Sequence, residues 1–189
     1  MSVNVQKAAL RKHLLEKRDA TSAELRNISS KKIHVNLRQN TSFTNSQNIA
    51  CYFPIGSEID TSDIMLDILQ QNKNLLLPKI INDNIEFYVV PNLEKLEKGS
   101  FEIMEPKDSC KKAAEINCVL IPTVGVSKAG IRLGYGKGYY DRFLSSTNAV
   151  KISLTYSKQI VKSIPSDSHD IKIDWIITED KTVKISQVS

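Results

Sequence analysis

The part of the sequence best suited to chemistry is a cluster of glycines in its second half. Five of the seven glycines and three of the six tyrosines lie close together: Gly125, Gly130, Gly134, Gly136, Gly138, Tyr135, Tyr139 and Tyr140. Glycine disfavours helices and strands, so this density indicates a loop that needs positive φ or close approach of its backbone. An apolar run at 118–122 precedes the loop, and a helix is expected to begin near Lys137 or Gly138. A strand, a glycine loop and a helix in this order bind phosphates, because loop N–H groups and the helix N-terminus both present positive charge.

Charged side chains in and near the loop suit the transfer of a phosphoryl group. Lys137 supplies a mobile cation for a phosphate or an intermediate, and Arg132 is suited to clamping phosphate in a bidentate manner. Asp141 and Asp174 are carboxylates of the kind that Mg²⁺ takes in addition to phosphate oxygens. Structural alternatives stay open for all four. In these alternatives, Arg132 would pair with an acid and Lys137 would face water. Asp141 would complement a helix N-terminus, and Asp174 would form a pair at a strand edge.

Two familiar nucleotide-binding motifs do not fit the loop. A P-loop requires glycine five residues before Gly136, where the sequence has Ile131, and Ser or Thr after Lys137, where it has Gly138. A dinucleotide-binding G-x-G-x-x-G that begins at Gly134 requires glycine at the position of Tyr139. The sequence therefore supports neither a P-loop NTPase nor a dinucleotide-dependent oxidoreductase.

The N-terminal segment is basic. Residues 1–38 hold nine cations and three acids, a net charge of +6, so the remaining residues sum to −1 of the total +5. Lys7 and Arg11 lie four residues apart on one face of the expected first helix, so both can reach a single triphosphate. A solvated helix face is the alternative. Nucleic acid is not expected as a partner, because the segment has no aromatic residue on which a base could stack.

Helices and strands alternate along the chain and must position these residues. Helices are expected over 3–19, from a Thr21–Glu24 capping box to about Gln39, and from Asp60 or Thr61. Strands are expected at 49–53, 75–78, 85–90, 118–122, 152–156, 175–178 and 183–185, with loops at 40–47 and 91–112. This alternation predicts an α/β fold with a mostly parallel sheet and helices on both faces. No repeat or linker divides the chain, so 1–189 is expected to form one domain with a basic helical arm over about 1–39.

Composition excludes several classes of protein. With 41% hydrophobic and 25% charged residues, the 189-residue chain can fill a core, so wholesale disorder is excluded. No apolar run approaches the ~18 residues of a membrane helix, and the N-terminus lacks the apolar region of a signal peptide. Cys51, Cys110 and Cys118 lack metal-ligand spacing and are expected to be reduced thiols. We therefore expect a cytoplasmic protein that has no membrane partner.

The block Gly130-Ile-Arg-Leu-Gly-Tyr-Gly-Lys-Gly-Tyr-Tyr-Asp-Arg142 closely resembles the signature of the 5-formyltetrahydrofolate cyclo-ligase family, also called methenyltetrahydrofolate synthetases. The resemblance continues in five shorter segments: Lys7–Arg11, Tyr52–Thr61, Ile103–Pro106, His169–Asp170 with Asp174, and Thr178–Glu179. The chain departs from the family pattern at Ser127, where Asp is frequent, and at Glu102, where Gly is frequent.

The resemblance implies a three-layer α/β fold related to ribose-5-phosphate isomerases and CoA transferases. It implies ATP-dependent conversion of 5-formyltetrahydrofolate, with or without a polyglutamate tail, to 5,10-methenyltetrahydrofolate, with ADP and phosphate as the other products and Mg²⁺ as cofactor. A monomer is expected.

The family's functional residues carry over to matching positions of this sequence. Lys137 and Arg132 are the expected catalytic residues. ATP is expected to contact Lys7, Arg11, Arg132, Leu133, Gly134, Tyr135, Gly136, Lys137, Gly138, Tyr139 and Tyr140. Folate is expected to contact Phe53, Glu58, Tyr135, Gly136, Lys137, Gly138 and Tyr139. Mg²⁺ is assigned to Asp141 and Asp174.

Glu58 is expected to accept hydrogen bonds from the amino and ring N–H groups of the pterin. The alternative is an acid in the first turn of a helix. Phe53 and Tyr139 are expected to pack on the pterin, although buried aromatic residues more often belong to the core.

Two other functions remain open from the residues alone. One is a related α/β enzyme that acts on a sugar phosphate or a CoA thioester and uses the glycine loop without ATP. The other is a non-catalytic nucleotide- or RNA-binding module that relies on the basic N-terminal segment.

Overall fold

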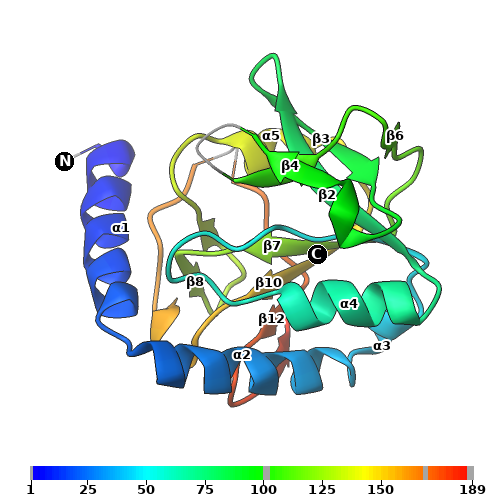
Figure 1. Cartoon of the computed structure of the whole chain (residues 1–189). Coiled ribbons are helices and arrows are strands. Elements are labelled where there is room, and N and C mark those ends of the chain that lie inside the picture. The colour runs from blue at the N-terminus through cyan, green and yellow to red at the C-terminus, as the bar shows by residue number, and fades with distance from the viewer. Residues whose placement is uncertain (1, 100–102, 168–169, 187–189) are drawn as a thin grey trace.

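An eight-stranded sheet forms the centre of the computed structural model, which describes residues 2–99, 103–167 and 170–186 (Figure 1). The strand order is β13-β12-β10-β7-β1-β2-β3-β6. The strands are β1 (Asn48–Ala50), β2 (Asn74–Ile81), β3 (Asn84–Val89), β6 (Lys111–Lys112), β7 (Cys118–Pro122), β10 (Val150–Leu154), β12 (Trp175–Ile177) and β13 (Thr182–Lys184). All pairings from β12 to β2 are parallel, and those of β13, β3 and β6 are antiparallel. The predicted, mostly parallel α/β sheet is confirmed. Glu102 and His169 lie outside the described residues.

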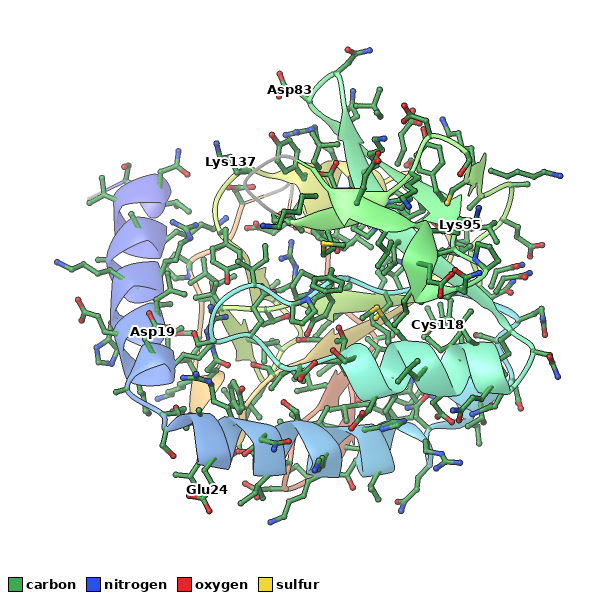
Figure 2. All side chains as sticks on the ribbon, in the orientation of Figure 1. Asp19, Glu24, Asp83, Lys95, Cys118 and Lys137 are labelled. Atoms are coloured by element: carbon green, nitrogen blue, oxygen red, sulfur yellow. The ribbon has the colours of Figure 1, made fainter. Side chains whose placement is uncertain are left out.

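Helices cover both faces of the sheet and complete three layers (Figure 1). The helices α2 (Ala23–Leu37) and α4 (Ser62–Gln70) pack against one face, and α5 (Tyr139–Leu144) packs against the other. The alternation of side chains along β7 produces this arrangement. Cys118 and Leu120 join the cluster with α2 and α4, whereas Val119 and Ile121 join the cluster with α5. Figure 2 shows Cys118 in the interior of the molecule.

The first helix, α1 (Val3–Asp19), stands at one side of the molecule beside a small second sheet (Figure 1). That sheet has the order β11-β8-β9 and consists of β8 (Gly125–Ser127), β9 (Arg132–Leu133) and β11 (Ile160–Val161). Leu14 of α1 is buried against Val124, Leu133 and Ile164. A Cβ atom on Gly125 would collide with Leu14 Cδ1, so glycine allows the helix to approach the sheet.

Several predicted element boundaries were wrong. Ser22 rather than Thr21 caps α2, because its side chain accepts a hydrogen bond from Leu25 N at 3.2 Å, whereas the Thr21 hydroxyl contacts Lys158. The predicted loops contain short elements: α3 (Thr41–Thr44), a 3-10 turn (Leu93–Lys95), β4 (Leu96–Lys98), β5 (Met104–Pro106) and β6. A second 3-10 turn spans Ser157–Gln159.

The strand β2 runs through Pro78 into an antiparallel hairpin with β3. Because β1 pairs with β2 only as far as Leu76, Pro78 lies where one side of β2 has no partner strand, and its missing N–H costs no hydrogen bond there. Among the described residues, no helix is long and apolar enough to cross a membrane.

Candidate active site

A cavity of about 870 Å³ lies beyond the carboxyl ends of β1 and β7, where α/β sheets bind ligands. Its volume suits a small-molecule site. It is bounded by α1, the segment after β1, the β2–β3 hairpin, β5, and the glycine loop that leads into α5. Of the residues predicted from the sequence, the cavity is lined by Lys7, Arg11, Phe53, Glu58, Arg132, Leu133, Gly134, Tyr135, Gly136, Lys137, Gly138, Tyr139, Tyr140 and Asp141. Every predicted site residue except Asp174 therefore meets in one place.

The glycine loop needs its glycines for two reasons. Gly136 and Gly138 have φ values of 98° and 71°, in the left-handed region that other residues adopt at a cost. A Cβ atom on Gly136 would also lie 3.2 Å from the guanidinium carbon of Arg11. Arg11 Nε donates a hydrogen bond of 2.7 Å to Gly134 O, so α1 holds the loop directly.

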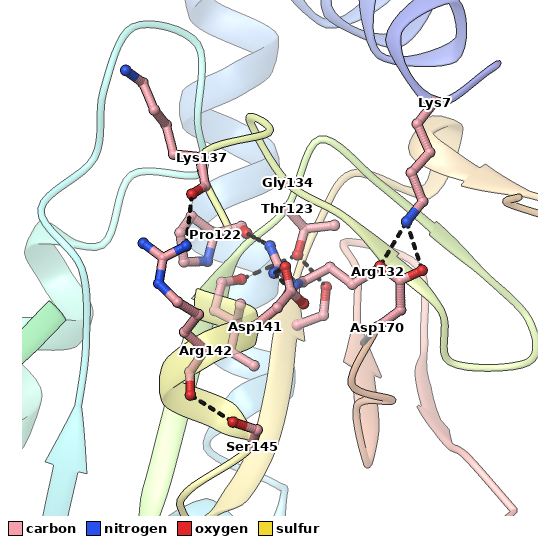
Figure 3. Close-up of polar contacts among 12 residues, drawn as sticks. Lys7, Pro122, Thr123, Arg132, Gly134, Lys137, Asp141, Arg142, Ser145 and Asp170 are labelled. Carbon is pink, nitrogen blue, oxygen red and sulfur yellow. Dashed lines mark hydrogen bonds and ion pairs between the residues drawn. The ribbon is translucent and has the colours of Figure 1, made fainter. Parts of the chain in front are cut away.

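Arg132 and Asp141 form an ion pair beside the loop (Figure 3). Arg132 Nη2 lies 3.0 Å from each carboxylate oxygen of Asp141, and the Arg132 side chain is 3% exposed. Its Nε atom has no hydrogen-bond partner among the described residues. The alternative in which Arg132 pairs with an acid is thus realised, and this pair fixes the orientation of the Asp141 carboxylate. Figure 3 shows the Lys137 side chain extending away from this pair.

Glu58 lies in the loop between β1 and α4. It precedes Ser62, the first residue of α4, so the alternative of a first-turn helix acid is wrong. The residue is 7% exposed, and its Oε2 accepts a hydrogen bond of 2.9 Å from Ile55 N. Burial raises the pKa of Glu58, while the Ile55 N–H, the charge of Arg18 and the Tyr135 hydroxyl act in the opposite direction. A buried carboxylate that accepts a hydrogen bond from the backbone therefore borders the cavity.

Lys7 enters the cavity from α1 and meets two acids from the C-terminal part of the chain, of which Figure 3 shows Asp170. Its Nζ lies 2.6 and 2.8 Å from the carboxylate oxygens of Asp170 and 3.3 Å from Asp167. Burial opposes the charge of Lys7, but these hydrogen bonds raise its pKa above the ordinary value. Asp170 also lines the cavity, although in the sequence only its place in the family pattern pointed to it.

Comparison with known proteins shows the family of the chain. Residues 3–179 match the model of the 5-formyltetrahydrofolate cyclo-ligase family. The chain belongs to this family. It is 28% identical to the mouse 5-formyltetrahydrofolate cyclo-ligase, with 95% of this chain and 97% of the mouse protein covered, and 32% identical to that of Mycoplasma pneumoniae, with 93% and 100% covered. The resemblance seen in the glycine block is confirmed.

Two solved structures of the same family resemble this cyclo-ligase chain. The NMR structure of the Aquifex aeolicus 5,10-methenyltetrahydrofolate synthetase superimposes with a TM-score of 0.87 at 34% identity, covering 97% of this chain and 94% of that one. The Mycoplasma pneumoniae 5,10-methenyltetrahydrofolate synthetase gives a TM-score of 0.75 at 31% identity, covering 92% and 98%. Family members are enzymes, so the cavity is a candidate active site.

Asp174 does not reach the cyclo-ligase cavity. It immediately precedes β12, and its carboxylate accepts a hydrogen bond of 2.8 Å from Lys151 N, near the start of the parallel strand β10. Residues before parallel strands lie at the opposite edge of the sheet from the residues that follow them. The structure therefore does not support a Mg²⁺ site shared by Asp174 and Asp141, and the strand-edge alternative holds for Asp174. No group of three or more metal-ligating side chains occurs among the described residues.

Sequence reasoning missed one further residue beside this site. Arg18 is buried in the last turn of α1 and bonds to two loops that border the cavity, through Ser57 and Tyr135. A signal was present in the sequence, since Lys7, Arg11 and Arg18 are spaced by four and seven residues and so share one face of the helix.

Proposed function

We propose that the chain catalyses the ATP-dependent cyclisation of 5-formyltetrahydrofolate to 5,10-methenyltetrahydrofolate, with release of ADP and phosphate. One observation carries the proposal: a single cavity collects a glycine loop, the cations of Arg11 and Lys137, and the buried carboxylate of Glu58. The loop and the cations suit the phosphates of ATP. The carboxylate suits the N–H donors of a reduced pterin.

The chemistry explains why both ligands must share one cavity. A formamide oxygen is a poor leaving group, so its direct loss as water is slow. Transfer of the γ-phosphoryl group from ATP to this oxygen gives ADP and an iminium phosphate. N10 then attacks the formyl carbon and closes the ring, the C–O bond breaks, and the former formyl oxygen leaves within inorganic phosphate, which can take up the proton lost from N10. The protein must hold the phosphoryl group in line with the formyl oxygen and neutralise its charge.

Lys137 and the loop backbone are the proposed groups for this neutralisation. The backbone amides from Gly134 to Gly138 are fixed before ATP arrives, because Arg11 bonds to Gly134 O and the loop glycines have set conformations. Lys137 adds a charge that can follow the transferring phosphoryl group. Arg132 acts in this proposal through Asp141, which it holds by both carboxylate oxygens.

We propose that Mg²⁺ is the cofactor of this reaction. Asp141 and Asp170 both line the cavity, and Mg²⁺ prefers carboxylate oxygens together with phosphate oxygens. We therefore assign the ion to Asp141 and Asp170 in place of Asp141 and Asp174. When bound, Mg²⁺ offsets the negative charge of the ATP phosphates.

The walls of the cavity divide between the two substrates in this proposal. ATP takes the side of α1, where Lys7 lines the cavity and Arg11 bonds to the glycine loop. The pterin takes the side of Glu58, with Phe53 and Tyr139 as packing surfaces. The proposal covers folate with a single glutamate and folate with a polyglutamate tail, since both share the same pterin.

We further propose a monomeric enzyme of the cytoplasm. The cysteines at 51, 110 and 118 are free and buried, as expected for a reducing compartment. Elution at the mass of one chain in size-exclusion chromatography tests the monomer.

A spectroscopic assay tests the activity. Near-UV absorbance of the methenyl product should grow only when ATP and 5-formyltetrahydrofolate are both present. An absorbance increase without ATP, or no increase at all, would contradict the proposal. It would favour an enzyme that acts on a sugar phosphate or a CoA thioester. RNA retention that weakens with salt, without turnover, would instead indicate a binding module.

A further inference from the structure

Arg18 lies behind the active-site cavity and does not line it. Its side chain is buried, with the whole residue 3% exposed, so contact with either substrate is excluded in this arrangement. Its guanidinium group nevertheless joins two segments that do line the cavity. Nε donates to Ser57 Oγ at 2.8 Å, next to Glu58, and Nη2 donates to the hydroxyl of Tyr135 in the glycine loop at 2.7 Å.

The direction of these hydrogen bonds determines what Glu58 can do. Arginine has only donors, so the Tyr135 hydroxyl must accept from Arg18. The one hydrogen of that hydroxyl is then available for the Glu58 carboxylate, whose pKa the Tyr135 hydroxyl lowers. Ile55 N donates to the same carboxylate. Every one of these contacts requires Glu58 to act as an acceptor, as a pterin would also require.

Ser57 shows the same ordering on the other side of Arg18. Its hydroxyl accepts from Arg18 Nε and donates to Asp19, the last residue of α1. Figure 2 shows Asp19 at the end of α1, near the start of α2. Two adjacent side chains at the end of α1, those of Arg18 and Asp19, therefore hold the segment Gly56–Glu58 through Ser57. The same helix holds the glycine loop through Arg11.

We propose that Arg18 is a positioning residue for the folate part of the site: through Tyr135 and Ser57 it fixes Glu58 as a carboxylate that faces the cavity. This inference rests on the proposed cyclisation, in which Glu58 binds the pterin. Because α1 also carries Arg11, the helix sets the positions of the folate and ATP groups together.

Electrostatics supports this role. Among titratable groups, Arg18 and Tyr135 act on Glu58, and Glu58 in turn raises the pKa of the phenols Tyr52 and Tyr140. Burial raises the pKa of Glu58, and Arg18 lowers it. Loss of the Arg18 charge would raise this pKa further. Glu58 would then take up a proton at higher pH, and folate binding would weaken over a pH range in which the parent still binds.

The test compares Arg18→Lys and Arg18→Met with the parent by calorimetric titration of 5-formyltetrahydrofolate and, separately, of ATP. Lysine keeps the charge but cannot donate to Ser57 and Tyr135 in the same fork, whereas methionine removes both charge and donors. We expect folate affinity to fall about tenfold in Arg18→Met, with ATP affinity within about twofold of the parent. As the pH is lowered, folate affinity should begin to fall at a higher pH in Arg18→Met than in Arg18→Lys or the parent.

Two further variants separate positioning from general stability. Arg38→Gln removes an arginine that is exposed and bonded to Asp67 outside the cavity, so it should leave both affinities and the pH profile unchanged. Tyr135→Phe removes only the hydroxyl from a partly exposed residue and should fold even if Arg18 variants do not. If Arg18 acts through this hydroxyl, Arg18→Lys should reduce folate affinity by a smaller factor in the Tyr135→Phe background than in the parent.

The outcomes are distinct. A parent that does not bind 5-formyltetrahydrofolate would overturn the proposed function and this inference with it. A parent that binds folate, together with Arg18 variants that bind it equally well or lose ATP and folate affinity to the same extent, would overturn this inference alone. A Tyr135→Phe variant that binds folate as tightly as the parent would also overturn this inference alone.

Discussion

Replacement of Glu58 by glutamine should separate substrate binding from stability. Glutamine keeps the shape of the side chain, and its amide oxygen can still accept from Ile55 N, as Glu58 Oε2 does at 2.9 Å. The amide nitrogen, however, is a donor where the carboxylate offers an acceptor. It would therefore face the hydroxyl of Tyr135 and the N–H groups of a bound pterin without being able to accept from either.

The size of the effect on binding follows from this loss of an acceptor. A hydrogen bond to a charged group contributes about 1.5–3 kcal/mol, which corresponds to a loss of roughly tenfold to a hundredfold in folate affinity. ATP affinity should stay near that of the parent, because Glu58 lies on the opposite side of the cavity from Arg11 in the proposed arrangement.

The stability of the unliganded Glu58→Gln variant should not fall, although its folate affinity does. Burial raises the pKa of Glu58 in the folded protein, so the folded state disfavours the charged form. For an acid with a raised pKa, stability increases as the pH falls through that pKa and is reduced at higher pH. Removal of the charge at neutral pH should therefore leave the unliganded variant at least as stable as the parent.

Two measurements test this prediction together. Calorimetric titration gives the affinities for 5-formyltetrahydrofolate and ATP, and thermal unfolding at neutral pH gives Tm without ligand. The expected result is weaker folate binding with an equal or higher Tm. Unchanged folate affinity would refute the assignment of Glu58 to the pterin, and a lowered Tm would refute the argument from burial.

Two other substitutions probe the phosphate side of the cavity. Lys137→Ala should lower kcat much more than it weakens folate binding, because its charge is needed while the phosphoryl group transfers; an unchanged kcat at saturating ATP would contradict this role. Arg11→Ala and Lys7→Ala should each raise KM for ATP and leave KM for folate nearly unchanged. The effect should be larger for Arg11, since its loss also frees Gly134 O from α1. A defect confined to folate would place α1 at the glutamate tail instead.

Much of the fold and the site could be predicted because the signals are local. The density of glycine between Gly125 and Gly138 identified the loop, and the spacing of Lys7 and Arg11 placed both on the helix face that meets it. Short apolar runs located the central strands, because strands buried on both faces must be apolar throughout.

The failures concern contacts that depend on tertiary placement. Asp174 and Asp170 are four residues apart, and only the position of β12 decides which of them reaches the cavity. Arg18 looked like one of many cations on a basic helix, and its partners lie 39 and 117 residues away in the chain. Thr21 and Ser22 are both good capping residues, and which of them caps α2 depends on where the backbone turns into the helix.

The fate of one oxygen atom tests the proposed reaction most directly. The substrate would be 5-formyltetrahydrofolate labelled with ¹⁸O in its formyl group, turned over with unlabelled ATP in unlabelled water, and the inorganic phosphate would be analysed by mass spectrometry. If the enzyme phosphorylates the formyl oxygen, each phosphate released should contain one ¹⁸O atom. Unlabelled phosphate, with the label lost to water, would show that ATP hydrolysis and ring closure do not proceed through a phosphorylated formyl oxygen.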